Sequence, residues 1–61
     1  MLVKEKNGVY LHLDRCLSGD HVWTVSGKGI ERLRWYGYQN AYHAENYFNK
    51  CVDTKYRNST E

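Results

Sequence analysis

The stretch RLRWYGYQNAYHAENYF, residues 32–48, decides the fold of this chain. Its first part, RLRWYGY, alternates with a period of two, as the residues of a strand do, so that Leu33 and Trp35 share one face. The side chains of the other face are basic or aromatic: Arg32, Arg34, Tyr36 and Tyr38. The pattern therefore predicts a strand with one buried face and one face that is open to a ligand.

A helix is predicted directly after this strand. Asn40 should open it, because its side-chain oxygen can accept hydrogen bonds from the free amides of a first helical turn. Apolar residues then recur at helical spacing: Ala41, Ala44, Phe48, Cys51 and Val52. We expect this apolar stripe to lie across Leu33 and Trp35, with Gly37 allowing a close approach to the strand backbone.

Two further strands are predicted upstream, over residues 2–6 and 9–15. They flank Asn7 and Gly8, the pair that best accepts the positive φ angles of a type I′ hairpin turn. In the second of these strands, apolar residues alternate with polar and aromatic ones: Val9, Leu11 and Leu13 with Tyr10, His12 and Asp14. Another strand is expected over residues 21–26, and a glycine-containing turn then leads into a strand over residues 30–38.

Together these elements predict an α+β fold, an antiparallel sheet of three to four strands with one C-terminal helix packed on one face. A chain of 61 residues buries only about 60% of its unfolded surface and supports one core. We therefore expect a single β-sheet-plus-helix domain over residues 1–54 and a flexible polar tail over residues 55–61. Thr24 joins the open face if the middle strand keeps its register.

Composition narrows the function classes. A net charge of +2 and a pI of 8.6 permit contact with phosphate or an acidic partner but fall short of a strongly basic nucleic-acid binder. No apolar run approaches the roughly 20 residues of a membrane span, and the first residues lack the shape of a signal peptide. A cytoplasmic protein without a membrane partner is expected, with Cys16 and Cys51 as free thiols.

Catalytic and metal chemistry are not expected. The residue types for a zinc site or a nucleophile pair are present as His12, His21, His43, Cys16 and Cys51. Their spacing contains neither a Cys-x-x-Cys nor a His-x-x-x-His pair, and the turn at Lys28 is too short for a phosphate-binding loop. The sequence thus predicts a protein that is not an enzyme and holds no cofactor or metal.

Several short motifs share their order with a known class of domain. They are Gly-Val-Tyr in an early strand, Gly-Lys-Gly in a turn, Arg-Trp-Tyr-Gly-Tyr, and then a helix that carries Ala44 and Phe48. Over roughly residues 7–50 the chain resembles the small three-stranded-sheet-plus-helix DNA-binding domains of phage-type integrases and of AP2 domains. It departs from their pattern where Asn40 stands for the usual Ser or Thr cap and His43 for the usual Glu. The order of elements is also similar to that of small uncharacterised phage and bacterial accessory proteins.

The resemblance implies a sheet that enters the major groove of DNA, with Arg32 or Arg34 at guanine edges or phosphates and Lys28 on a phosphate. Stacking of Tyr36 and Tyr38 on unpaired bases is an alternative way to contact nucleic acid. The predicted binding residues are Tyr10, His12, Lys28, Arg32, Arg34, Tyr36 and Tyr38.

Two other interpretations stay open. Tyrosine, tryptophan and arginine dominate protein interfaces, so the same surface fits an inhibitor or adaptor that binds a host protein. In the plainest interpretation, Arg32 and Arg34 are solvated strand residues that pair with acidic neighbours and bind nothing. The sequence leaves the oligomeric state open.

Overall fold

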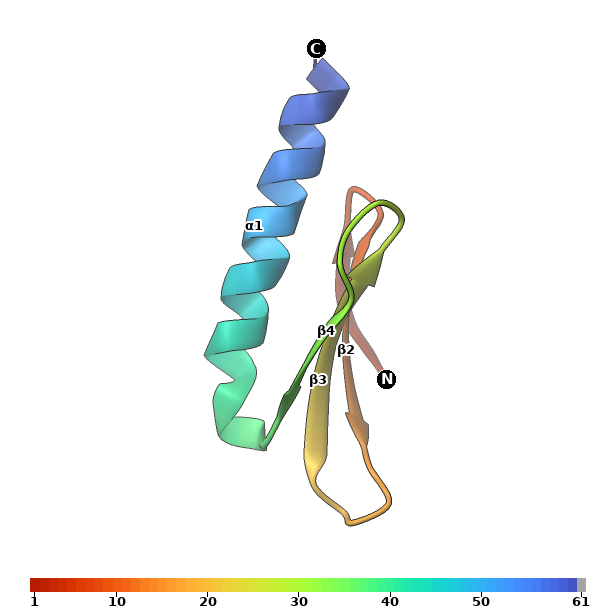
Figure 1. The fold of residues 1–61 in the computed structure, drawn as a ribbon, viewed down its shortest axis with the longest axis vertical. Coiled ribbons are helices and arrows are strands. Elements are labelled where there is room, and N and C mark those ends of the chain that lie inside the picture. The colour runs from red at the N-terminus through yellow and green to blue at the C-terminus, as the bar shows by residue number, and fades with distance from the viewer. Residues whose placement is uncertain (61) are drawn as a thin grey trace.

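The computed structural model describes the backbone of residues 1–60 and the side chains of residues 1–54 (Figure 1). Its elements follow in the order β1 (Leu2–Lys6), β2 (Val9–Arg15), β3 (His21–Gly27), β4 (Leu33–Tyr36), the 3-10 turn η1 (Tyr38–Asn40) and α1 (Ala41–Thr60). The strands form one sheet in the order β1-β2-β3-β4, and every neighbouring pair is antiparallel. The predicted α+β fold is confirmed, with four strands.

The turn between β1 and β2 is the one that the sequence predicted. Asn7 and Gly8 have φ angles of 56° and 81°, the positive values that a type I′ turn requires at both central positions. The amide of Gly8 also donates a hydrogen bond to a carboxylate oxygen of Glu5, at 3.0 Å. Local sequence therefore sets the register in which β1 and β2 begin to pair.

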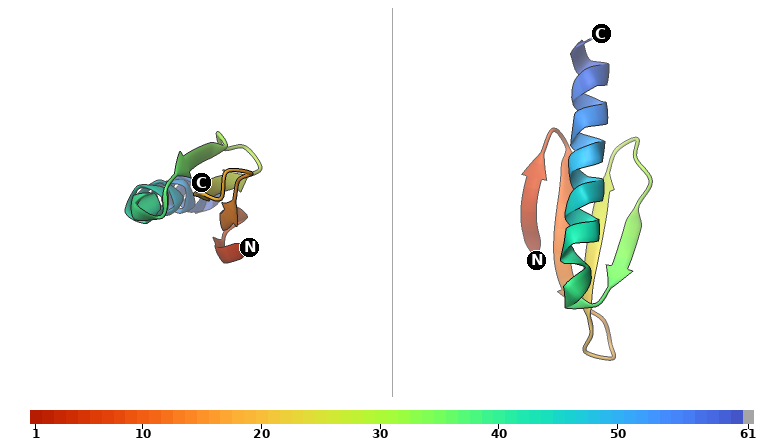
Figure 2. Two further views of the ribbon diagram at one scale, coloured as in Figure 1. Left: turned by 90° about the horizontal axis from the view of Figure 1, so that it is seen from below. Right: turned by 90° about the vertical axis from the view of Figure 1, so that its left-hand side faces the viewer.

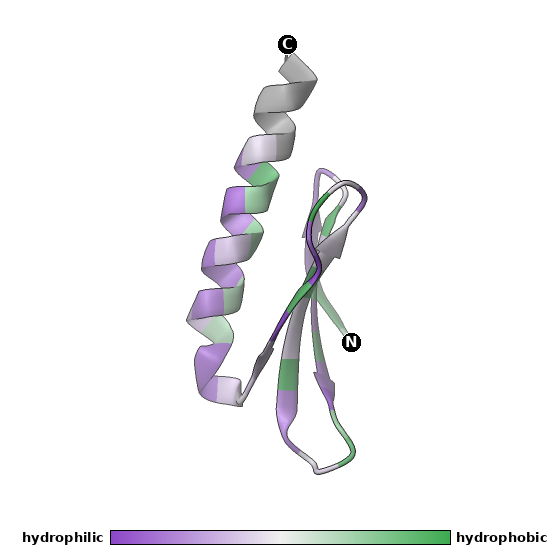
Figure 3. Cartoon of the chain, viewed as in Figure 1, coloured by the Kyte–Doolittle hydropathy of each residue, from purple (hydrophilic) through white to green (hydrophobic). Residues whose placement is uncertain are grey.

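The core lies between α1 and the two central strands (Figure 2). Its buried members are Val9, Leu11, Trp23, Val25, Ala44, Phe48, Cys51 and Val52. The predicted apolar stripe of α1 is thus confirmed, and Figure 3 shows the hydrophobic side of the helix turned toward the sheet. Its position differs from the prediction, because the stripe lies mainly over the central strands β2 and β3, and Leu33 and Trp35 are only at the border of the core.

Leu33 and Trp35 are half-buried at the border of this core, since β4 is an edge strand. The ring of Trp35 packs against that of Tyr47, with 5.6 Å between centroids. The hydroxyl of Tyr47 donates to the carbonyl of Glu31 at 2.7 Å. This aromatic pair attaches β4 to the helix at the edge of the core.

The strand β4 is shorter than predicted, because it ends at Tyr36 and not at Tyr38. Gly37 has a φ of 104°, which interrupts the alternation, and its amide donates to the carbonyl of His21 at 2.8 Å. The side-chain amide of Asn40 donates to the carbonyl of Tyr36 at 2.6 Å. Gly37 therefore makes the chain turn sharply from the sheet into α1, a different role from the close packing that the sequence suggested.

The backbone of α1 is helical as far as Thr60, beyond the end of the predicted domain at residue 54. The predicted flexible tail, residues 55–61, stays a prediction, because its side chains and Glu61 lie outside the description. Within the described part of the chain, no helix is long and apolar enough to cross a membrane. Both cysteines are free, Cys51 buried on α1 and Cys16 half-buried after β2.

Candidate functional site

Figure 2 shows that α1 covers one face of the sheet. The opposite face carries three cross-strand rows of side chains. Directly paired residues of antiparallel strands project from the same face. The central row consists of Leu2, His12, Thr24 and Arg34, and it crosses all four strands. The rows on either side are Glu5, Tyr10 and Ser26, and Asp14, Val22 and Tyr36. We call these three rows the open face.

Small side chains occupy the centre of the open face, and larger ones flank it. Val22 and Thr24 of β3 are only 8% and 9% exposed, although no element of the described residues packs over them. Tyr10 on β2 and Arg34 and Tyr36 on β4 are exposed. Long side chains of the neighbouring strands therefore shield β3 from water while their own outer surfaces stay accessible.

The aromatic surface on β2 is partly ordered by contacts within the strand. The rings of Tyr10 and His12 lie nearly parallel, with an interplanar angle of 26° and 6.4 Å between centroids. Two residues apart on a strand, they project from the same face. Flat rings held in similar orientations can stack on a planar ligand with little further loss of side-chain freedom.

Four of the predicted binding residues are brought together on the open face: Tyr10, His12, Arg34 and Tyr36. Lys28 lies in the turn after β3, beyond the Ser26 end of the face, and is exposed. Arg32 precedes β4 and is not a member of any row. It is exposed in the loop, because the paired part of β4 begins only at Leu33.

Tyr38 leaves the open face altogether. The positive φ of Gly37 turns the Tyr38 side chain to the covered side of the sheet. Its ring centroid lies 5.2 Å from that of His21, in a T-shaped pair, and 5.9 Å from that of Trp23. The indole nitrogen of Trp23 donates to the carbonyl of Tyr38 at 3.3 Å. Period-two counting beyond Tyr36 therefore placed Tyr38 on the wrong side of the sheet.

The open face carries little net charge. Arg34 is the single arginine or lysine among its three rows, whereas Glu5 and Asp14 supply carboxylates. The amino terminus of Met1 donates to the carbonyl of Leu13 at 2.9 Å and also pairs with the carboxylate of Asp14. The hydrogen bond that the Asp14 carboxylate accepts from the amino terminus, together with the positive charge of that group, lowers the pKa of Asp14.

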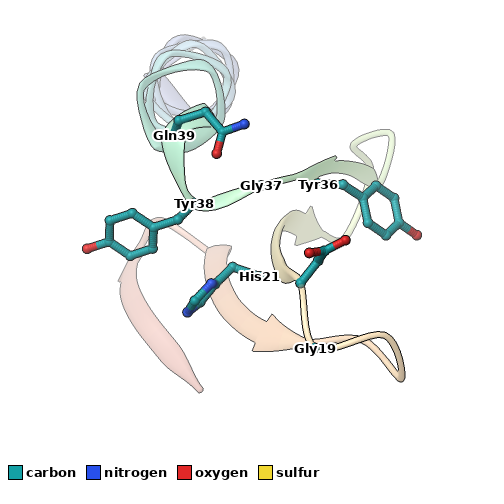
Figure 4. A pocket seen from close by; sticks show the side chains of 7 residues that line it. Gly19, His21, Tyr36, Gly37, Tyr38 and Gln39 are labelled. Atoms are coloured by element: carbon teal, nitrogen blue, oxygen red, sulfur yellow. The ribbon is translucent and has the colours of Figure 1, made fainter.

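A hollow of about 420 Å³ lies at the end of the sheet where Tyr36 is found (Figure 4). It is lined by Gly19, Asp20, His21, Tyr36, Gly37, Tyr38 and Gln39. Figure 4 shows the Tyr36 and Tyr38 rings directed to opposite sides of Gly37, with His21 on the side of Tyr38. Sequence reasoning missed this hollow, because the turn before β3 and the end of β4 meet only when the sheet has formed. The glycines at 19 and 37 were its one available signal.

The turn between β2 and β3 also presents a polarised thiol. The sulfur of Cys16 lies 2.9 Å from the hydroxyl oxygen of Ser18, and this hydrogen bond lowers the pKa of the thiol. The backbone amide of Cys16 donates to the carbonyl of Asp20 at 3.0 Å. Nowhere in the described residues do three or more histidine, cysteine or acidic side chains gather as metal ligands would.

No protein-family model, curated protein or solved structure matches this chain. Function is therefore inferred from the open face and the hollow themselves.

Proposed function

We propose that this chain is a non-enzymatic binding module whose open face contacts nucleic acid, by stacking on unpaired bases. The observation that carries the proposal is the row of His12, Thr24 and Arg34, which is flanked by Tyr10 and Tyr36 on the same face. Aromatic rings stack on any base, and a guanidinium can pair with phosphate or stack in turn. An uncharged centre with a single arginine beside it suits such contacts.

Unpaired strands fit this face better than a duplex. A sheet in the major groove needs several cations along it to neutralise phosphates. The open face offers Arg34, with Lys28 in the turn beyond it, while Arg32 and Tyr38 stand apart from the rows. Stacking depends less on charge and contributes about 1 to 3 kcal/mol per base.

Fluorescence anisotropy with labelled single-stranded and duplex oligonucleotides across a salt series tests the proposal. Tyr36→Ala should weaken single-strand binding by the loss of one stack, about 1 to 3 kcal/mol. Tyr42→Ala is the matched control, because Tyr42 on α1 is 59% exposed and Tyr36 is 58% exposed. Equal weakening by both variants, or an absence of binding at low salt, would refute the assignment.

A second pair of variants tests the contribution of positive charge to binding. Arg34→Ala should weaken binding and flatten its salt dependence, because one phosphate contact is lost. Arg15 is also an exposed arginine, but it and its register partner His21 project from the face of the sheet opposite to the open face. Arg15→Ala should therefore leave binding nearly unchanged.

A protein partner is the second candidate function. It is favoured by exposed apolar side chains at Met1 and, in β1, at Leu2 and Val3, which adjoin the open face where Leu2 pairs with His12. An interface of this kind depends weakly on salt, whereas nucleic-acid contact falls steeply with it. A purified partner that is lost with Leu2→Asp and Tyr36→Ala but kept with Tyr42→Ala would favour this second function.

A further inference from the structure

The hollow at the end of the sheet has a chemical character that differs from the open face. Among the described residues that line it, three carry aromatic rings, one carries a carboxylate and none is lysine or arginine. The carboxylate belongs to Asp20. The rings of His21 and Tyr38 lie together on one side of Gly37, 5.2 Å apart between centroids, whereas the ring of Tyr36 is directed to the other side. Its volume of about 420 Å³ lies within the usual range for sites of small ligands, about 300 to 1,000 Å³.

From this lining we infer that the hollow binds a small organic cation, an ammonium or guanidinium group. Cations are attracted to the faces of aromatic rings within about 6 Å of the centroid. The Asp20 carboxylate in the same hollow adds an opposite charge and, for guanidinium, two parallel acceptors. Asp20 would repel an anion, so the hollow is unsuited to the phosphates proposed for the open face.

Ring packing and a backbone hydrogen bond hold part of this lining in place. The Tyr38 ring packs against the rings of His21 and Trp23, yet the residue remains 61% exposed, so much of its surface stays accessible. The hydrogen bond from the amide of Gly37 to the carbonyl of His21 joins the residue after β4 to the start of β3. A site that is already ordered loses little conformational freedom on binding.

The glycines of the hollow permit a direct test by ¹H–¹⁵N NMR. Agmatine should shift the amide resonances of Gly19 and Gly37 in a saturable way. The resonances of Gly8 and Gly29, in the turns after β1 and β3, serve as internal controls. Shifts that rise linearly without saturation, or that appear equally at all four glycines, would overturn the site.

Asp20→Asn should weaken agmatine binding about tenfold, because a charge-assisted contact becomes a neutral one. The variant keeps the backbone carbonyl of residue 20, which accepts a hydrogen bond from the amide of Cys16. Asp53→Asn removes an exposed carboxylate from α1 and should leave agmatine binding unchanged. Equal weakening by both variants would show a general charge effect and overturn the assignment.

A capped Gly-Arg-Gly peptide distinguishes the source of the cation. Tighter binding of the peptide than of agmatine identifies a basic side chain of a peptide as the ligand, and the reverse order identifies a free amine. Binding of acetate in place of either cation would overturn the inference. Asp20→Asn should leave nucleic-acid binding at the open face intact, so the cation site and the proposed function can fail independently.

Discussion

The two faces of the sheet share one alternation and use it in opposite ways. On the covered face, Val9, Leu11 and Val25 are fully buried beneath α1. On the open face, His12 and Thr24 come from the same two strands and Arg34 from β4, and of these three residues only Thr24 is buried. The comparison teaches that most of the core lies on the covered side, whereas the residues proposed to bind lie on the open side. Under the proposed function, substitutions should therefore affect mainly folding on the covered face and mainly binding on the open face.

The largest effect is expected from Trp23→Ala on the covered face. Trp23 is 6% exposed within the core, and loss of a buried tryptophan costs about 3 to 5 kcal/mol. That is comparable with the whole stability of so small a domain, so the variant should be largely unfolded. Trp35→Ala should cost less, because Trp35 is half-buried at the sheet edge. Urea denaturation followed by circular dichroism measures both, and an equal cost would contradict the position assigned to the core.

A much smaller effect on stability is expected on the open face. Arg34→Ala removes an exposed side chain and should change the free energy of unfolding by no more than about 0.5 kcal/mol. The same urea titration tests it. A loss of unfolding free energy close to that of Trp23→Ala would show that the open face contributes to the core and would contradict the distinction between the two faces.

The two thiols compare the core with the turn between β2 and β3. Cys16 is half-buried beside Ser18 and has a lowered pKa, whereas Cys51 is buried on the side of α1 that faces the sheet. Because the thiolate is the reactive form, Cys16 should react with iodoacetamide in the native protein and Cys51 only after unfolding. Mass spectrometry of the labelled chain locates the adduct. Ser18→Ala should slow labelling of Cys16, and an unchanged rate would exclude the role of the Ser18 hydroxyl.

The smallest effect concerns pH. The pKa of Asp14 is lowered by its hydrogen bond to the amino terminus. A carboxylate whose folded pKa is depressed adds stability above its unfolded pKa, near 3.8, and loses that contribution as pH falls through the folded pKa. Wild-type protein should thus lose slightly more stability below about pH 4 than Asp14→Asn does. Urea midpoints measured against pH give the comparison, with Asp53→Asn as the control.

Periodicity and turn chemistry predicted most of the fold. The alternation in residues 9–15, the pair Asn7 and Gly8, and the apolar stripe of the helix are all local patterns, and the structure confirms them. Side chains two apart on a strand or four apart on a helix share a face whatever their partners are. Four members of the candidate site, on β2 and β4, were therefore predictable from spacing alone.

Only the tertiary structure decided where β4 ends and what meets there. The last β4 pair joins Tyr36 to Val22, and Gly37 then turns the chain, which moves Tyr38 away from the open face and leaves the hollow beside Asp20. Likewise, the helix lies over β2 and β3 because burial is greatest at the centre of a sheet. Spacing determines which residues share a face, whereas the extent of pairing between strands determines how far that face continues.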